Sequence, residues 1–302
     1  PYVLALGDKE TATQRLNLAQ AFNPVGLIVG LLIAQQFVLK KLQSDDITDF
    51  NILDEASKIL IKTSDLLVIR NPYVVLGLVI IAVFILFATI KMPSYKDENG
   101  MTSIGNTFSS LGKDKKYVYG VIAQFLNVGA MIMCWTYIYQ YAEAIGISSV
   151  TAGYFQMAAF ILFTIGRGFG TYLLRFVNAG KLLMYFALLA MAFILGTVFI
   201  TGIIGLYSLV LVSFCLSLMF PTIYGIALGN LNEEQSKIGS AGLVMAIVGS
   251  ALLPKLQGAI IDIGGRGVND TLIIGVSEVN FSFLLPLLCF SYIAMYGSKI
   301  GQ

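Results

Sequence analysis

The sequence contains no histidine and few charged residues. Of its 302 residues, 12% are Asp, Glu, Lys or Arg and 57% are hydrophobic, whereas a soluble domain is about one quarter charged. Without histidine, the chain cannot build a histidine-ligated metal site, a Ser-His catalytic pair or a histidine proton relay. The composition therefore predicts an all-α polytopic membrane protein.

Cysteine is also scarce, and the charges are nearly balanced. Cys134, Cys215 and Cys289 each lie within an apolar run and lack the spacing of a disulfide or metal site, so we expect buried small residues. The net charge of +2 gives no indication of nucleic-acid binding. The chain starts at Pro1 without a signal peptide, so we expect it to be the tail of a longer protein.

Long apolar runs are abundant. Hydropathy predicts eight spans, each able to cross a hydrocarbon core about 30 Å thick. The predicted spans are residues 15–38, 72–92, 117–142, 150–174, 181–201, 203–229, 239–262 and 279–297. The loop at 39–71 has mixed charge, and its apolar spacing predicts a short amphipathic helix.

A second long, polar loop leaves two spans before it and six after it. Basic residues gather at its end, in Lys113-Asp-Lys-Lys116, which favours a cytoplasmic position for the loop and for the C-terminus. Six spans after such a loop are typical of one half of a transporter. We therefore predict a remainder of an N-terminal bundle at 1–92, a central cytoplasmic loop at 93–116 and a C-terminal six-helix bundle at 117–302.

The first predicted span carries a stripe of neutral amides. Asn17, Gln20 and Asn23 follow each other at steps of three residues, which places them on one side of a helix. Amides inside a membrane must find partners or line a wet cavity. The stripe therefore belongs either to a solute pathway or to the contacts between helices.

The third predicted span has a comparable face, made of Gln124, Asn127, Met131 and Trp135. Such a face suits a sugar, because amides can donate to and accept from hydroxyls and an aromatic ring can pack on a pyranose. Hydrogen bonding between helices around a core tryptophan accounts for the same pattern, and both hypotheses stay open. The tyrosines that follow, at positions 137, 139 and 141, predict an interfacial aromatic belt.

Several residues within the later spans weaken helices or allow close packing, and we predict structural or gating roles for them. Gly166 and Gly170 form a GxxxG pair, and Arg167 between them can reach the interface or a carbonyl. A proline in mid-span predicts a kink at Pro221. The seventh span contains the further helix-weakening residues Gly249 and Pro254.

Acidic residues are missing from the middle of every predicted span, since Glu143, Asp262 and Glu278 lie near span ends. Proton coupling generally needs an intramembrane carboxylate, and this chain taken alone lacks one. The motifs GxSxG and HExxH and paired intramembrane acids are absent as well, so we expect no enzyme activity and no metal.

Several stretches resemble the fucose–proton symporter family, a sugar branch of the major facilitator superfamily. They are Pro1–Gly7, Arg15–Gln20 with Phe22 and Asn23, Ala123–Phe125 with Val128–Ala130, Cys134 and Trp135, Gly166–Arg167 with Gly170–Thr171, Phe220–Ile223, and Val244–Met245 with Gly249, Pro254, Gly258 and Asp262. The match runs in order from end to end. It implies that the eight spans correspond to helices five to twelve of that family.

The resemblance further implies alternating access, with two six-helix bundles rocking around a central sugar and with the proton, not a cofactor, as coupling ion. It places the family's sugar contacts at Gln20 and Asn23, and Asn127, Met131 and Phe220 depart from the residues common in the family. The family's coupling carboxylates fall before Pro1. We list Gln20, Asn23, Gln124, Asn127, Trp135 and Phe220 as predicted sugar-binding residues.

The resulting expectation is a monomeric sugar–proton symporter in a cytoplasmic (inner) membrane, with fucose or a related hexose or deoxyhexose as substrate and lipid, not nucleic acid, as its surroundings. A passive sugar facilitator and a glucose/galactose transporter of the same superfamily are the alternatives. We also expect that the 302-residue chain does not transport by itself.

Overall fold

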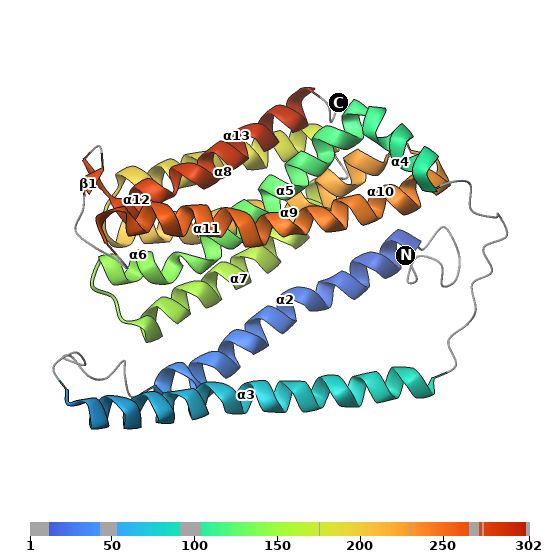
Figure 1. The fold of residues 1–302 in the computed structure, drawn as a ribbon. Helices are drawn as coiled ribbons and strands as arrows, with labels where there is room; N and C mark the ends of the chain where they lie inside the picture. The colour runs from blue at the N-terminus through green and yellow to red at the C-terminus, as the bar shows by residue number, and fades with distance from the viewer. Residues whose placement is uncertain are drawn as a thin grey trace. The chain divides into compact units, whose positions relative to one another are not determined.

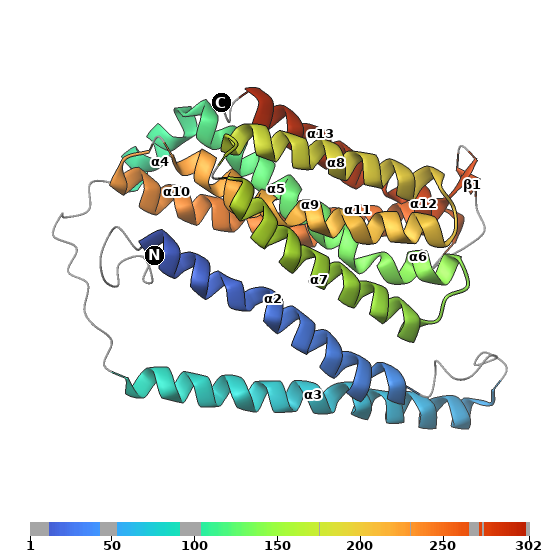
Figure 2. The same cartoon turned by 180° about the vertical axis from the view of Figure 1, so that it is seen from behind.

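A computed structural model describes most of the chain. The described residues are 12–42, 53–90 and 104–299, apart from Arg175, Asn230, 266–271 and Ile274, and the side chains of 12–24, 104–106 and Glu233 lie outside the description. The chain separates into two compact units, Pro1–Gly100 and Met101–Gln302. Both are drawn in Figure 1 and, from behind, in Figure 2, and each is described by itself.

The described part of the first unit contains two long helices. Helix α2 covers Ala12–Phe37, followed by the 3-10 turn η2 at Leu39–Lys41. Helix α3 covers Glu55–Thr89, and the side chain of Asp54 caps its start by accepting a hydrogen bond from the backbone N–H of Ser57 at 3.2 Å. Capping of this kind satisfies a free N–H group at the start of a helix.

The expected loop at 39–71 is therefore wrong over most of its length. Helix α3 begins at Glu55 and runs through Pro72 without interruption. The short amphipathic helix and the second span are one element, because a single missing hydrogen bond at proline costs less than leaving further backbone groups unpaired in apolar surroundings. The most apolar 18-residue stretch of α3 is 0% buried, so lipid or other protein has to cover it.

Within its described residues, the second unit contains six spans long and apolar enough to cross a membrane. Its helices are α4 (Ile104–Lys113), α5 (Lys115–Thr136), α6 (Ile138–Ala144), α7 (Ser149–Leu173), α8 (Ala179–Phe199), α9 (Ile203–Leu228), α10 (Glu233–Met245), α11 (Gly249–Ile261), α12 (Glu278–Ser282) and α13 (Leu284–Lys299), with 3-10 turns η5 (Ala246–Val248) and η6 (Asp262–Gly264). A two-stranded antiparallel hairpin, β1 (Leu272–Ile273) with β2 (Val276–Ser277), precedes α12. Together with α2 and α3, the described residues supply the eight expected helices.

Helices α5 and α9 form the centre of this bundle. Helix α9 packs against α5, α7 and α8, and α5 also packs against α11 and α13. The most apolar stretch of α9 is 61% buried, the highest fraction among the spans found in the described residues. Helix α9 runs unbroken through Pro221, so the proline expected to kink the span lies inside a continuous helix.

Three of the six spans are interrupted at other positions. The first span is divided at Tyr137 into α5 and α6, the fifth is divided by η5 into α10 and α11, and the last is divided at Phe283. Helix α10 ends at Met245 and α11 begins at Gly249, so the break lies at the start of the weak segment that the sequence predicted, and Pro254 lies inside α11. The divided spans lie beside one another, because α5 packs against η5, α11 and α13.

The predicted polar loop at 93–116 contains helix α4, which hydropathy alone did not reveal. Leu111 of α4 is buried in a cluster with Tyr117, Ala227 and Leu243. The Thr107 hydroxyl donates to the Glu234 carboxylate at 3.1 Å. Helix α4 is amphipathic and too short to cross a membrane, so its apolar face packs on the end of the bundle.

Candidate functional site

The amide side chains of Gln124 and Asn127 are enclosed in the second unit. Their exposed fractions are 0% and 1%. All four amide nitrogen and oxygen atoms are buried, and they have no hydrogen-bond partner within the described part of the chain. An unsatisfied buried polar group costs about 1–3 kcal/mol, so such a pair is unusual and needs an explanation.

The position of the two amides follows from the packing of α5. At about 100° per residue, Gly129 lies about 140–160° around the helix from Gln124 and Asn127. Gly129 packs on Leu253 of α11. Gly120, on the same side as the amides, has Ala227 of α9 and the Tyr296 hydroxyl of α13 as close neighbours. The amides therefore lie on the face of α5 that is turned away from α11.

Trp135, expected on the same face, is held by protein contacts. Its indole N–H donates to the Ser213 hydroxyl of α9 at 3.1 Å. Phe160 and Phe163 of α7 pack edge-on against it, with ring centroids at 4.9 and 5.2 Å. In this conformation Trp135 has the contacts of a core tryptophan, which is one of the two hypotheses that the sequence left open. Its role in sugar binding stays a prediction.

Gln156 and Gln257 are among the further buried amides of this unit. Gln156 of α7 is 5% exposed, and its amide nitrogen has no partner among the described residues. Gln257 of α11 is fully buried and donates to the Ser282 hydroxyl at 3.0 Å. Sequence reasoning did not select Gln257 as a site residue, although the rule that an amide inside a span needs a partner would have found it.

The predicted close approach at Gly166 and Gly170 is present, and it is directed at α9. A Cβ atom built on Gly166 would lie 2.5 Å from the Phe214 carbonyl oxygen, and one on Gly170 would lie 2.9 Å from a methyl carbon of Leu218. The guanidinium of Arg167 lies 4.9 Å from the centre of the Phe163 ring. Arg167 thus neighbours the aromatic cluster around Trp135 instead of a carbonyl.

The expected aromatic belt is wrong for Tyr141, and the hydroxyl of half-buried Tyr137 also has a partner inside the bundle. Tyr141 is fully buried, and its hydroxyl lies within hydrogen-bonding distance of the Ile200 carbonyl, at 3.2 Å, and of the Asn280 amide nitrogen, also at 3.2 Å. The Tyr137 hydroxyl donates to the Pro254 carbonyl at 2.7 Å. Both tyrosines join helices within the bundle, because buried phenolic hydroxyls need a partner.

The remaining predicted residues do not gather in one place that the structure describes. The side chains of Gln20 and Asn23 lie outside the described residues. Phe220 is half-buried on α9, and its ring stacks on that of Tyr224 at 6.4 Å. Gly249 packs against the Phe125 carbonyl of α5. No cluster of three or more Cys, Asp and Glu side chains able to hold a metal ion occurs in the described ranges.

Comparison with known proteins gives a consistent result. A profile of the Major Facilitator Superfamily matches residues 3–254. The chain is 50% identical over 305 residues to the L-fucose-proton symporter of Haemophilus influenzae, covering 99% of this chain and 69% of that protein. It is 31% identical to the L-fucose-proton symporter of Escherichia coli, covering 100% of this chain and 67% of that protein.

Two other similarities extend the comparison. The glucose/galactose transporter of Brucella abortus is 31% identical over 98% of this chain and 66% of its own length. The crystal structure of the transporter FucP in the outward conformation matches with a TM-score of 0.72 and 30% identity, covering 100% of this chain and 71% of that one. The chain thus spans about two thirds of the proteins it matches.

Proposed function

Because the chain belongs to the major facilitator superfamily, we propose that it transports a sugar, L-fucose or a related hexose or deoxyhexose, together with a proton. The 50% identity to an L-fucose-proton symporter over 99% of the chain supports the sugar and the coupling ion. We further propose alternating access, a monomeric state, and a position in a cytoplasmic membrane with residues 93–116 and the C-terminus on the cytoplasmic side.

The observation that carries the proposal is the pair of orphaned amides on α5. Gln124 and Asn127 present two donor groups and two acceptor groups without partners in the described structure. Hydroxyl groups of a sugar both donate and accept, so they match this set. A ligand that supplies these hydrogen bonds removes the cost of leaving the amides unsatisfied.

Access to these amides requires movement. With exposed fractions of 0% and 1%, neither side chain can meet a ligand in the described conformation. The interruptions at Tyr137 and at η5 allow parts of two neighbouring spans to shift, and divided helices are common where transporters bind substrate. We propose that opening around α5 exposes the amides to the sugar, and that Gln20, Asn23 and Phe220 are further sugar-binding residues.

The test is uptake of labelled L-fucose by the transporter that contains this chain, measured with and without an inward pH gradient. We expect a dependence on the gradient and loss of most uptake on Gln124→Leu or Asn127→Leu, with unchanged protein in the membrane. Phe220→Leu, at a further predicted sugar-binding residue, keeps an apolar side chain on α9 and should mainly change affinity. The proposal would be overturned if uptake were unchanged without the pH gradient and also unchanged in the Gln124→Leu and Asn127→Leu variants.

A glucose/galactose transporter is the second candidate, because two such proteins match at 31% identity, as does one of the fucose symporters. Competition separates the two candidates. Unlabelled L-fucose should inhibit uptake more strongly than glucose or galactose at equal concentration. The reverse order would favour the second candidate, and uptake that runs equally in both directions without a pH gradient would indicate a passive facilitator.

A further inference from the structure

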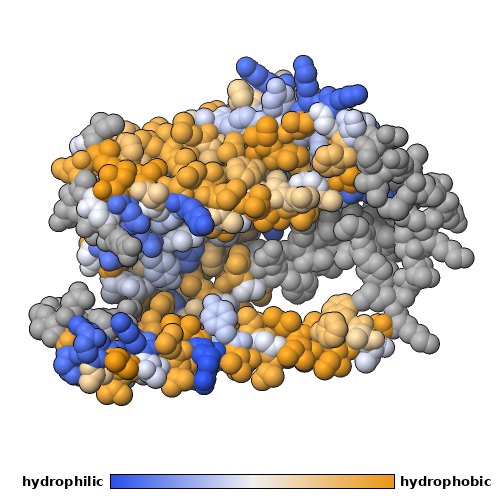
Figure 3. Space-filling model, viewed as in Figure 1, coloured by the Kyte–Doolittle hydropathy of each residue, from blue (hydrophilic) through white to orange (hydrophobic). Residues whose placement is uncertain are grey.

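A groove lies on the outside of the second unit, between α5, α11 and α13. Its volume is about 400 Å³, and its lining is mainly apolar, with Leu126, Leu253, Leu288, Tyr292 and Met295 among the residues. The volume falls within the range of small-molecule pockets, about 300–1,000 Å³. Leu288 is 65% exposed and Met295 45% exposed, so the groove is open at the surface. Figure 3 shows an extended hydrophobic surface over this part of the unit.

The two helices that form the walls of the groove run antiparallel, and tyrosines fix their alignment. The Tyr292 hydroxyl lies 3.5 Å from the Tyr119 carbonyl oxygen, and the Tyr296 hydroxyl lies 3.5 Å from the Lys116 carbonyl oxygen. The start of α5 therefore lies beside the end of α13. Residues at the start of α5 and residues at the end of α13 therefore lie at the same end of the groove.

Each wall of the groove ends in a lysine. On α13 the apolar lining at Leu288, Tyr292 and Met295 continues at the same helical spacing to Lys299, and on α5 the residue three turns before Leu126 is Lys115. Both lysines are exposed and neither forms an ion pair within the described residues. The neighbouring acid, Asp114, accepts a hydrogen bond from the Tyr117 N–H at 3.2 Å as the cap of α5.

We propose that this groove binds one phospholipid with an anionic headgroup. Its acyl chain fills the apolar groove, and Lys115 and Lys299 hold the headgroup phosphate at the end where α5 begins. Charge decides the occupant. A zwitterionic lipid would fill the apolar part equally well, but its ammonium group would offset the attraction of its phosphate to the two lysines, whereas the phosphate of an anionic lipid has no such opposing charge. Basic residues beside a groove between membrane helices are known features of sites for anionic lipids.

The experiment is native mass spectrometry of the purified transporter, titrated with phosphatidylglycerol or with phosphatidylcholine of the same acyl chains. We expect the first phosphatidylglycerol to bind more tightly than phosphatidylcholine. Lys115→Gln combined with Lys299→Gln should weaken phosphatidylglycerol binding about 25-fold, about fivefold for each lysine, and weaken phosphatidylcholine binding much less, because the net charge of that headgroup is zero. Both lysines are exposed, so the change does not disturb the core.

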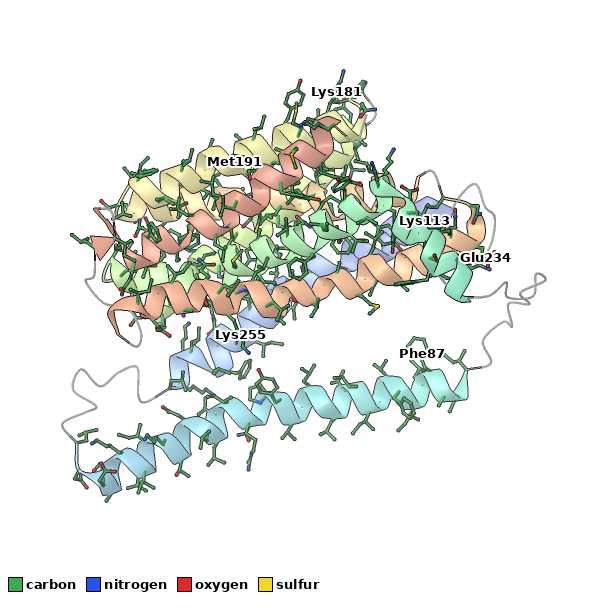
Figure 4. All side chains as sticks on the ribbon, turned by 45° about the horizontal axis from the view of Figure 1, so that its top comes forward. Phe87, Lys113, Lys181, Met191, Glu234 and Lys255 are labelled. Atoms are coloured by element: carbon green, nitrogen blue, oxygen red, sulfur yellow. The ribbon has the colours of Figure 1, made fainter. Side chains whose placement is uncertain are left out.

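Two further variants make the assignment specific. Lys41→Gln combined with Lys255→Gln removes the same charge from η2 and from α11, where Lys255 is labelled in Figure 4, and should leave the lipid preference intact. Ser291→Trp places a bulky ring in the groove lining and should weaken the binding of both lipids. The proposal would be overturned by equal affinity for the two lipids, by an equal loss in the Lys41 and Lys255 control, or by unchanged lipid binding in Ser291→Trp.

Discussion

The Tyr137 hydroxyl donates a hydrogen bond to the Pro254 carbonyl at 2.7 Å, and this contact joins two interrupted spans. Tyr137 lies where α5 passes into α6, and Pro254 lies within α11 just after η5. Proline in a helix leaves a backbone acceptor unpaired and weakens the local turn. The hydrogen bond from Tyr137 thus connects the break between α5 and α6 to the turn of α11 that Pro254 weakens. We therefore expect these two segments to move together.

Replacing Tyr137 by Phe should therefore reduce stability while keeping the ring. We expect a loss of about 0.5–1.5 kcal/mol in the free energy of unfolding, the net contribution of one hydrogen bond. Thermal unfolding of the purified protein in detergent measures this loss. Tyr139→Phe is the matched control, because no described hydrogen bond involves the Tyr139 hydroxyl, and its midpoint should stay at the wild-type value. Equal midpoints for both variants would contradict the prediction.

The same hydroxyl also explains why residue 258 is glycine. A Cβ atom on Gly258 would lie 2.8 Å from the Tyr137 hydroxyl oxygen, whereas the next ring atom lies 3.9 Å away. Gly258→Ala should therefore destabilise the wild-type protein by displacing the tyrosine. In a Tyr137→Phe background the same alanine should be neutral or stabilising, because the nearest atom is gone and alanine favours the helix. The measurement is a double-mutant cycle by thermal unfolding, and additive effects would speak against the contact.

The sequence predicted the number of helices because span length and hydropathy depend on the membrane, not on tertiary contacts. It did not predict where the helices break. Pro221 lies inside a continuous helix, whereas the interruption between α5 and α6 at Tyr137 has no proline or glycine beside it in the sequence. The partners of Tyr141 and Trp135, which lie more than 50 residues away along the chain, were not predictable either, because periodicity gives the face of a helix but not its neighbour.

The glycines of α7 offer a direct test of close helix packing. Gly166→Ala should destabilise the protein by about 1–3 kcal/mol, because its methyl group would lie 2.5 Å from the Phe214 carbonyl oxygen. Gly168→Ala is the control, since a Cβ atom there meets no described atom within 4 Å. Its midpoint should stay the same or rise, as alanine is the better helix former. If both alanines lower the unfolding temperature equally, the α7–α9 contact is not the cause.

Trp135 and Ser213 should be energetically coupled if the tryptophan belongs to the core. Trp135→Phe and Ser213→Ala each remove the hydrogen bond between α5 and α9. The double variant should be more stable than the sum of the two losses predicts, by about 0.5–1.5 kcal/mol. For a tryptophan that only packs in the core, the affinity for sugar, measured by uptake, should fall only in variants whose stability also falls. A fall in affinity of Trp135→Phe at unchanged stability would instead support a ring that contacts the sugar.

Gln124 and Gln257 are both fully buried amides, but only Gln257 has a described partner, the Ser282 hydroxyl. Gln257→Leu should cost about 0.5–1.5 kcal/mol, because it removes that hydrogen bond. Gln124→Leu should leave stability unchanged or raise it, since it removes an amide whose burial is not compensated. Its effect should appear in uptake alone. Thermal unfolding and uptake of the two variants, measured side by side, distinguish a residue kept for its ligand from one kept for helix packing; equal destabilisation of both would assign Gln124 to packing.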